Sequence, residues 1–114
     1  MATIAPLDVS ILTRMMGTSD PAYLRDVTRL FVKSTRRMLG DLRRAWERAD
    51  MDALLLAAHG LKGAARTVGA TPLAGIMATL EDGLRRKTPN LPIAESLAQS
   101  QDEFNRLVIW LRKL

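Results

Sequence analysis

Apolar residues recur every three or four positions along most of this chain, which is the spacing that gathers them on one face of an α-helix. Four such stripes are visible, and each predicts one long amphipathic helix. Their apolar positions are Leu24, Val27, Phe31, Met38, Leu42 and Trp46; Met51, Leu54, Ala58, Leu61, Ala65 and Val68; Leu73, Ile76, Met77, Leu80 and Leu84; and Ile93, Leu97, Phe104, Leu107, Val108, Leu111 and Leu114. A shorter helix is predicted before them, over about 7–16.

Capping residues and prolines mark where these helices begin and end. Asp20-Pro21 places a side-chain acceptor before a proline that suits the first helical position, and Thr71-Pro72 repeats this pattern. Asp50 is placed to cap the helix that follows it, and Gly69 ends that helix where a left-handed residue is favoured. The longest break between helices is 88–92, which contains two prolines.

We therefore predict an all-α fold in which residues 1–114 form one domain. The expected arrangement is an antiparallel, up-down-up-down four-helix bundle with a short extra N-terminal helix. Composition agrees, because 47% of the residues are hydrophobic but only 4% are aromatic, which is typical of helix packing. The chain has no cysteine, which excludes disulfides and thiolate chemistry. No apolar run approaches the roughly 20 residues that a membrane span needs, so we expect no membrane insertion and a cytoplasmic location.

The chain carries a net charge of +5, from 17 basic and 12 acidic residues. Such an excess can serve a nucleic acid, an acidic membrane surface or an acidic protein partner, or it can be an ordinary solvated surface. The basic residues do not alternate with aromatic ones, as they would on a platform for single-stranded nucleic acid. Charge alone therefore identifies no partner, and we expect none to be a nucleic acid.

His59 is the one residue around which a chemical site is readily built. With a single histidine and no cysteine, the usual zinc sites are excluded, and the chain has neither a nucleophile elbow nor the glycine spacing of a phosphate-binding loop. His59 lies about 100° around the helix from Ala58, at the edge of the apolar stripe or outside it. Lys62, Gly63 and Arg66 follow His59 at spacings that place them on its face.

This combination suits phosphoryl transfer between proteins. A neutral imidazole is a nucleophile near neutral pH, and a neighbouring ammonium offsets the charge of an incoming phosphoryl group. Gly63 leaves a bare patch on which another protein can come close. Each feature is weak by itself, because a lone surface histidine is usually only a polar residue and glycine also interrupts other predicted helices.

Further residues make the pattern specific. The segment Ala58-His59-Gly60-Leu61-Lys62-Gly63-Ala64-Ala65, followed by Val68-Gly69-Ala70, Leu73-Ala74 and Leu80-Glu81, resembles a histidine-containing phosphotransfer (HPt) domain of a two-component phosphorelay. The motif spans about 57–85, and the order of helices around it is similar over nearly the whole chain. Ala64 departs from the family, in which serine is frequent at this position, and this puts only a local hydrogen bond in doubt.

The resemblance implies a role for each residue of the motif. His59 would accept a phosphoryl group from an aspartate of a receiver domain and pass it to another. Lys62 would steady the phosphoryl oxygens, and Glu81, where the family often carries Gln or Glu, would orient the imidazole. The implied receiver-docking residues are Gly63, Arg66, Arg85 and Leu55.

The resemblance also implies partners and cofactors. The partners would be receiver domains of hybrid histidine kinases and response regulators, and the domain itself would be a monomer. It would hold no cofactor, because the Mg²⁺ that transfer needs would sit on the receiver. Relatives are free-standing or form the last module of a hybrid sensor kinase. In the second case the domain would be the cytosolic part of a membrane-bound protein. Without a nucleotide-binding motif, we expect no ATP-dependent kinase activity.

Two alternative functions remain. The dimerisation and phospho-acceptor domain of a histidine kinase is also helical with a surface histidine, but it typically has an acidic residue directly after that histidine and a proline five residues after it. Gly60 and Ala64 occupy these positions here. The second alternative is a basic helical interaction module without phosphotransfer, for which no recognition-helix motif is visible.

Overall fold

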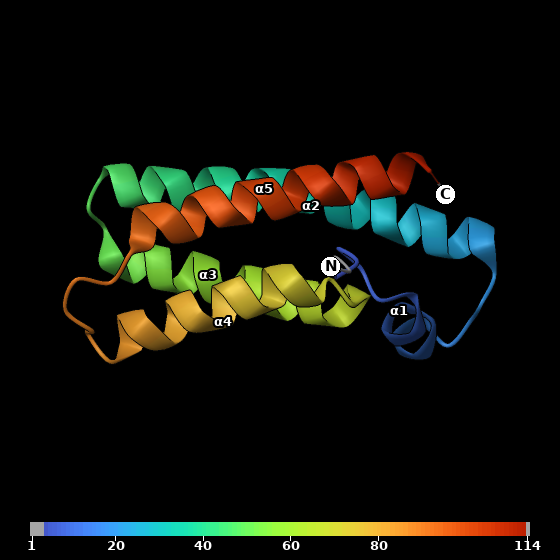
Figure 1. Cartoon of the computed structure of the whole chain (residues 1–114), viewed down its shortest axis with the longest axis horizontal. Helices are drawn as coiled ribbons and strands as arrows, with labels where there is room; N and C mark the ends of the chain where they lie inside the picture. Colours follow the sequence, from blue (N-terminus) through green and yellow to red (C-terminus); the bar gives the residue numbers. More distant parts are fainter. Residues whose placement is uncertain (1–3, 114) are drawn as a thin grey trace.

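The computed structural model describes residues 4–113, and these form five α-helices and no strand. The helices are α1 (Val9–Met16), α2 (Pro21–Glu47), α3 (Met51–Val68), α4 (Thr71–Arg85) and α5 (Ile93–Arg112). The four longer helices lie along the long axis of a molecule that measures 44 × 31 × 22 Å (Figure 1). The predicted all-α class is confirmed.

The four long helices share one core. α3 packs against α2 and α4, and α5 closes the arrangement by packing against α2 and α4 as well. α1 lies at one end, where it contacts α3 and α2 (Figure 1). Leucines from every helix fill the interior, and the fully buried ones include Leu12, Leu42, Leu54, Leu80 and Leu107. None of the helices within residues 4–113 combines the length and the apolar character that crossing a membrane requires.

Most predicted helix ends are confirmed because they depend on local hydrogen bonds. The Asp20 carboxylate accepts a hydrogen bond from the Ala22 N–H at 3.3 Å, and the Asp50 carboxylate accepts one from the Ala53 N–H at 3.0 Å. Gly69 follows α3 with a φ of 82°, the left-handed conformation that the pattern predicted. α2 ends at Glu47, one residue after the last residue of its apolar stripe, Trp46.

Two predicted helix starts are wrong by one or two residues. α1 begins at Val9, because the Asp8 carboxylate accepts the Ser10 N–H at 2.9 Å and so caps the helix. Thr71 is already the first residue of α4, and its hydroxyl donates to the Gly69 carbonyl at 3.2 Å instead of capping the helix.

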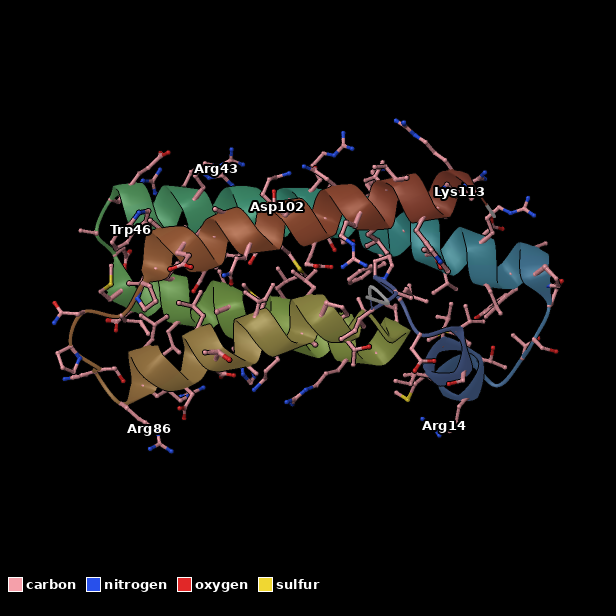
Figure 2. All side chains as sticks on the ribbon, in the orientation of Figure 1. Arg14, Arg43, Trp46, Arg86, Asp102 and Lys113 are labelled. Atoms are coloured by element: carbon pink, nitrogen blue, oxygen red, sulfur yellow. The ribbon has the colours of Figure 1, made fainter. Side chains whose placement is uncertain are left out.

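The ends of two apolar stripes also differ from the prediction. Trp46 and Met51 are each 38% exposed, although both belong to the apolar stripes of their helices. They flank the turn between α2 and α3. Trp46 lies at the end of the molecule, where fewer helices surround it (Figure 2). Ala45 is buried in place of Trp46. Leu114, assigned to the stripe of the last helix, lies outside the described residues.

The N-terminal segment is anchored to the end of α3. The Asp8 N–H donates to the Gly69 carbonyl at 2.7 Å, and the Asp8 carbonyl lies only 2.6 Å from the position that a Cβ on Gly69 would occupy. Gly69 therefore serves both the left-handed turn and the close approach of the chain before α1.

Candidate functional site

His59 projects from the middle of α3 toward solvent. The inward face of this helix is formed by Leu54, Ala58, Leu61 and Ala65, which have no exposed surface. His59 follows Ala58 by one residue, so the helical rotation of about 100° carries it out of the core. Its side chain is 59% exposed. This agrees with the sequence-based placement of His59 at the edge of the apolar stripe or outside it.

Glu81 on α4 faces His59 across the contact between α3 and α4. Its side chain is only 6% exposed, because it lies on the buried side of α4 next to Leu80. The Oε2 atom of Glu81 is 2.6 Å from the Nδ1 atom of His59. The imidazole of His59 is thus held by a carboxylate that the neighbouring helix presents.

Two basic side chains hold the same carboxylate. Lys62 forms an ion pair with Oε1 of Glu81, and Arg85 donates to Oε2 from Nη2 at 2.8 Å and from Nε at 3.2 Å. Lys62 comes from α3 and Arg85 from α4, one turn beyond Glu81. A mostly buried carboxylate with several charged donors satisfies the condition under which a charge is tolerated away from water.

These partners determine the protonation of the pair. The Lys62 ammonium first, and the Arg85 guanidinium second, lower the pKa of Glu81 from 4.5 to about 2, against the opposing effect of its burial. An ionised carboxylate has no proton to donate, so Nδ1 of His59 carries the hydrogen of the shared bond. In the neutral imidazole the lone pair is then on Nε2, on the exposed ring. This is the form of a histidine that can act as a nucleophile.

The partner of Lys62 in the structure is Glu81, whereas the sequence analysis assigned Lys62 to the phosphoryl oxygens. The sequence placed it beside His59 and free to meet phosphoryl oxygens. Its side chain is on the predicted face, but it is only 18% exposed and is engaged by Glu81. The helical spacing predicted its position, whereas its partner depends on how α4 packs against α3.

A bare patch adjoins the imidazole. Gly60 and Gly63 are both exposed, and a Cβ built on either would have no heavy atom within 4 Å beyond its own helix. Leu56, one turn before His59, is 73% exposed. The sequence analysis did not select Leu56, although its spacing of three residues from His59 was a signal that it shares that face. His59 is therefore flanked on α3 by two exposed positions without a side chain and by one exposed leucine.

The other three predicted docking residues lie in different surroundings. Arg66 is exposed on α3, and it forms no ion pair with another residue in the range 4–113. Leu55 is half-buried and lines a cavity of about 450 Å³ together with Leu84 and Leu91. Arg85 lies on Glu81, inside the cluster that holds His59.

Carboxylates and the histidine do not gather into a metal site in the described part of the chain. No group of three or more Asp, Glu or His side chains there is arranged to hold a metal ion.

The known proteins that this chain resembles are Hpt domains and proteins. The family model of the Hpt domain matches residues 26–111. The crystal structure of histidine-containing phosphotransfer protein B (HptB) from Pseudomonas aeruginosa PAO1 has a TM-score of 0.84 and 26% sequence identity, over 97% of this chain and 95% of that one. The HPT domain of the Hpt sensor hybrid histidine kinase from Shewanella has the same fold, with a TM-score of 0.78 and 16% identity over 96% of this chain and 92% of that one. No curated protein matches significantly.

Proposed function

Because the chain belongs to the Hpt domain family and is a phosphotransfer intermediate of a phosphorelay, we propose that His59 is the residue that carries the phosphoryl group. The observation that carries this assignment is the contact between Nδ1 of His59 and the ionised Glu81, which leaves Nε2 with its lone pair on an exposed ring. His59 is also the only histidine of the chain.

The transfer step follows from this protonation state. The lone pair of Nε2 forms a bond to phosphorus while the bond between phosphorus and the aspartate oxygen of the donor receiver breaks. That oxygen keeps the bonding electrons and becomes a carboxylate. His59 keeps its proton on Nδ1, so the ring gains a positive charge that Glu81 stabilises. The reverse step delivers the group to an aspartate of the next receiver.

Lys62 and Glu81 assist this step in different ways. Glu81 fixes the orientation and the tautomer of the imidazole. Lys62 supplies positive charge to the phosphoryl oxygens, where negative charge is concentrated during transfer. The Mg²⁺ that phosphoryl transfer needs is contributed by the receiver.

The receiver domain docks on the bare patch around His59. Gly60 and Gly63 leave room for its backbone, and Leu56 offers an apolar anchor beside them. Leu55 and Arg66 extend this surface along α3. The domain acts in the cytoplasm as a monomer, either free-standing or as the last module of a hybrid kinase, and its helices form an antiparallel, up-down-up-down four-helix bundle with α1 as an extra helix.

A phosphotransfer assay tests the assignment to His59. Incubation with a phosphorylated receiver is expected to add one phosphoryl group that is labile in acid and stable in base, and the His59→Gln variant is expected to gain none. A thermal melt of the variant checks that its fold is intact. Label that persists in His59→Gln means that another residue is the acceptor.

Light scattering separates this function from that of a kinase dimerisation domain. A phosphotransfer bundle that is complete in one chain is expected to have the mass of a monomer. A stable dimer that autophosphorylates with ATP would instead identify the kinase domain.

A further inference from the structure

Glu81 has more cationic partners than its single charge requires. Oε1 is held by Lys62, and Oε2 is shared by His59 and by two nitrogens of Arg85. Lys62 and His59 come from α3, while Arg85 extends from α4 and keeps an exposed guanidinium. The function proposed above uses His59, Lys62 and Glu81, and it leaves the contact between Arg85 and Glu81 without a role.

The proposed role of Lys62 creates a conflict that this contact resolves. Lys62 is paired with Glu81 in the unphosphorylated site, but it must approach the phosphoryl oxygens on Nε2 during transfer. Withdrawing one partner from a buried ion pair is unfavourable, because the remaining charge is left in a poorly solvated place. With Lys62 as its only cation, Glu81 would hold the ammonium back from the phosphoryl group.

We propose that Arg85 is a positioning residue for phosphotransfer, which stays on Oε2 of Glu81 and so allows Lys62 to leave Oε1 for the phosphoryl group on His59. This inference rests on the proposed function of His59. It differs from the receiver-docking role that the sequence resemblance implied, because Arg85 acts inside the domain through Glu81.

The two carboxylate oxygens of Glu81 contact different cations. Arg85 donates its hydrogen bonds to Oε2, whereas the ion pair of Lys62 is with Oε1, so the departure of Lys62 breaks none of the contacts that Arg85 makes. Arg85 also lies four residues after Glu81 on one helix, the spacing at which such pairs meet without rearrangement of the backbone. Lys62 is three residues from His59, within reach of a group attached to its ring.

A small phosphodonor separates this role from docking. Phosphoramidate transfers its phosphoryl group to Nε2 as its own P–N bond breaks and ammonia leaves with the electron pair, so no receiver is involved. We expect Arg85→Ala to slow this labelling of His59 by about tenfold or more, as the loss of a charge-assisted hydrogen bond would. Arg85→Lys keeps a cation and is expected to recover most of the rate.

Arg86→Ala is the matched control. Arg86 is the residue that caps the end of α4, and it also pairs with a carboxylate four residues before it, Asp82, but no contact joins it to Glu81. Its removal changes the net charge by the same amount and is expected to leave the labelling rate unchanged. Thermal melts of both variants show whether either change acts through the fold.

The decisive comparison is made in a domain that also carries Glu81→Gln. A neutral amide does not need a cation and does not hold Lys62, so Arg85→Ala is expected to change the labelling rate less than about twofold when combined with Glu81→Gln. An equal loss of rate in both backgrounds would mean that Arg85 meets the phosphoryl group directly, and would overturn the proposal.

The remaining outcomes are equally decisive. If Arg85→Ala slows transfer from a receiver but leaves labelling by phosphoramidate unchanged, Arg85 is a docking residue and the proposal is wrong. If the wild-type domain is labelled at His59 at the same rate as Arg85→Ala with both donors, the proposal fails while the function of His59 stands. If His59 of the wild-type domain is not labelled at all, both fail together.

Discussion

The Nδ1 atom of His59 on α3 lies 2.6 Å from the Oε2 atom of Glu81 on α4, so the side chain of His59 is itself part of the contact between two helices. The exposed imidazole is oriented by a carboxylate that is almost fully buried. The position of the imidazole therefore depends on the same packing of α3 against α4 that forms the core. Changes to Glu81 are expected to affect both stability and transfer.

Acid is expected to weaken the folded state through Glu81. Its pKa is about 2 in the folded protein and 4.5 in the reference state, so the carboxylate is more readily ionised when the chain is folded. The resulting stabilisation is complete above about pH 4.5 and is lost as the pH falls toward about 2. Denaturant unfolding across this window is expected to show a steeper loss of unfolding free energy for wild type than for Glu81→Gln.

Asp82→Asn is the control for that titration. Asp82 is the next residue, and its exposed pairing with Arg86 contributes little to stability. The pH dependence of this variant is expected to resemble that of wild type. Parallel curves for wild type and Glu81→Gln would show that the buried carboxylate does not contribute to the acid response.

Replacing Lys62 is expected to reduce transfer more than it reduces binding. Lys62→Met keeps the buried stem of the side chain and removes the ammonium, and Lys62→Ala removes both. The charge matters most while the phosphoryl group is moving, so we expect the single-turnover rate to fall by about tenfold or more in Lys62→Met. The dissociation constant of the receiver, measured by titration, is expected to change much less. Equal losses in rate and affinity would reassign Lys62 to docking.

Sequence alone predicted those parts of the fold that depend on neighbours along the chain. Asp20 and Asp50 cap helices because their carboxylates reach N–H groups two or three residues away, and Gly69 adopts the left-handed conformation that glycine tolerates. Trp46 has the periodicity of a buried residue but is partly exposed, because its burial depends on what surrounds the end of α2.

The candidate site, like the fold, could be predicted from the sequence only where it depends on neighbours along the chain. Helical periodicity placed His59, Lys62 and Gly63 on one face, since all three belong to α3. The partnership of His59 with Glu81 was implied by the family resemblance. That Lys62 and Arg85 meet on Glu81 follows from the packing of α4 against α3, which local spacing does not determine.

Gly69→Ala is expected to destabilise the fold strongly. Its φ of 82° disfavours any side chain, and the added Cβ would lie 2.6 Å from the Asp8 carbonyl, which belongs to the backbone. We expect a loss of about 2 kcal/mol or more in unfolding free energy, measured by denaturant titration. Gly17→Ala is the matched control, because Gly17 has a φ of 70° but open space around its Cβ position. If both variants lose the same stability, the contact with Asp8 contributes nothing.

Gly63 is expected to show opposite effects on stability and on function. A Cβ at this position meets nothing within 4 Å, so Gly63→Ala is expected to stabilise the domain by up to about 1 kcal/mol through helix propensity. Gly63→Gln adds another good helix former, but its long side chain covers the bare patch one turn from His59. We expect this variant to be at least as stable as wild type in a thermal melt, and to lose most of its affinity for the receiver and most of its phosphotransfer.

Gly75→Gln distinguishes docking from a general effect of the new side chain. Gly75 is also an exposed helical glycine with open space around it, but it belongs to α4 and lies six residues before Glu81, about 120° away around the helix. The same substitution there is expected to leave receiver binding and transfer unchanged. Phosphoramidate is small enough to reach His59 past the added side chain, so it is expected to label Gly63→Gln at nearly the wild-type rate. A Gly63→Gln variant that folds normally and accepts the phosphoryl group from a receiver as fast as wild type would mean that the receiver does not approach His59 over this patch.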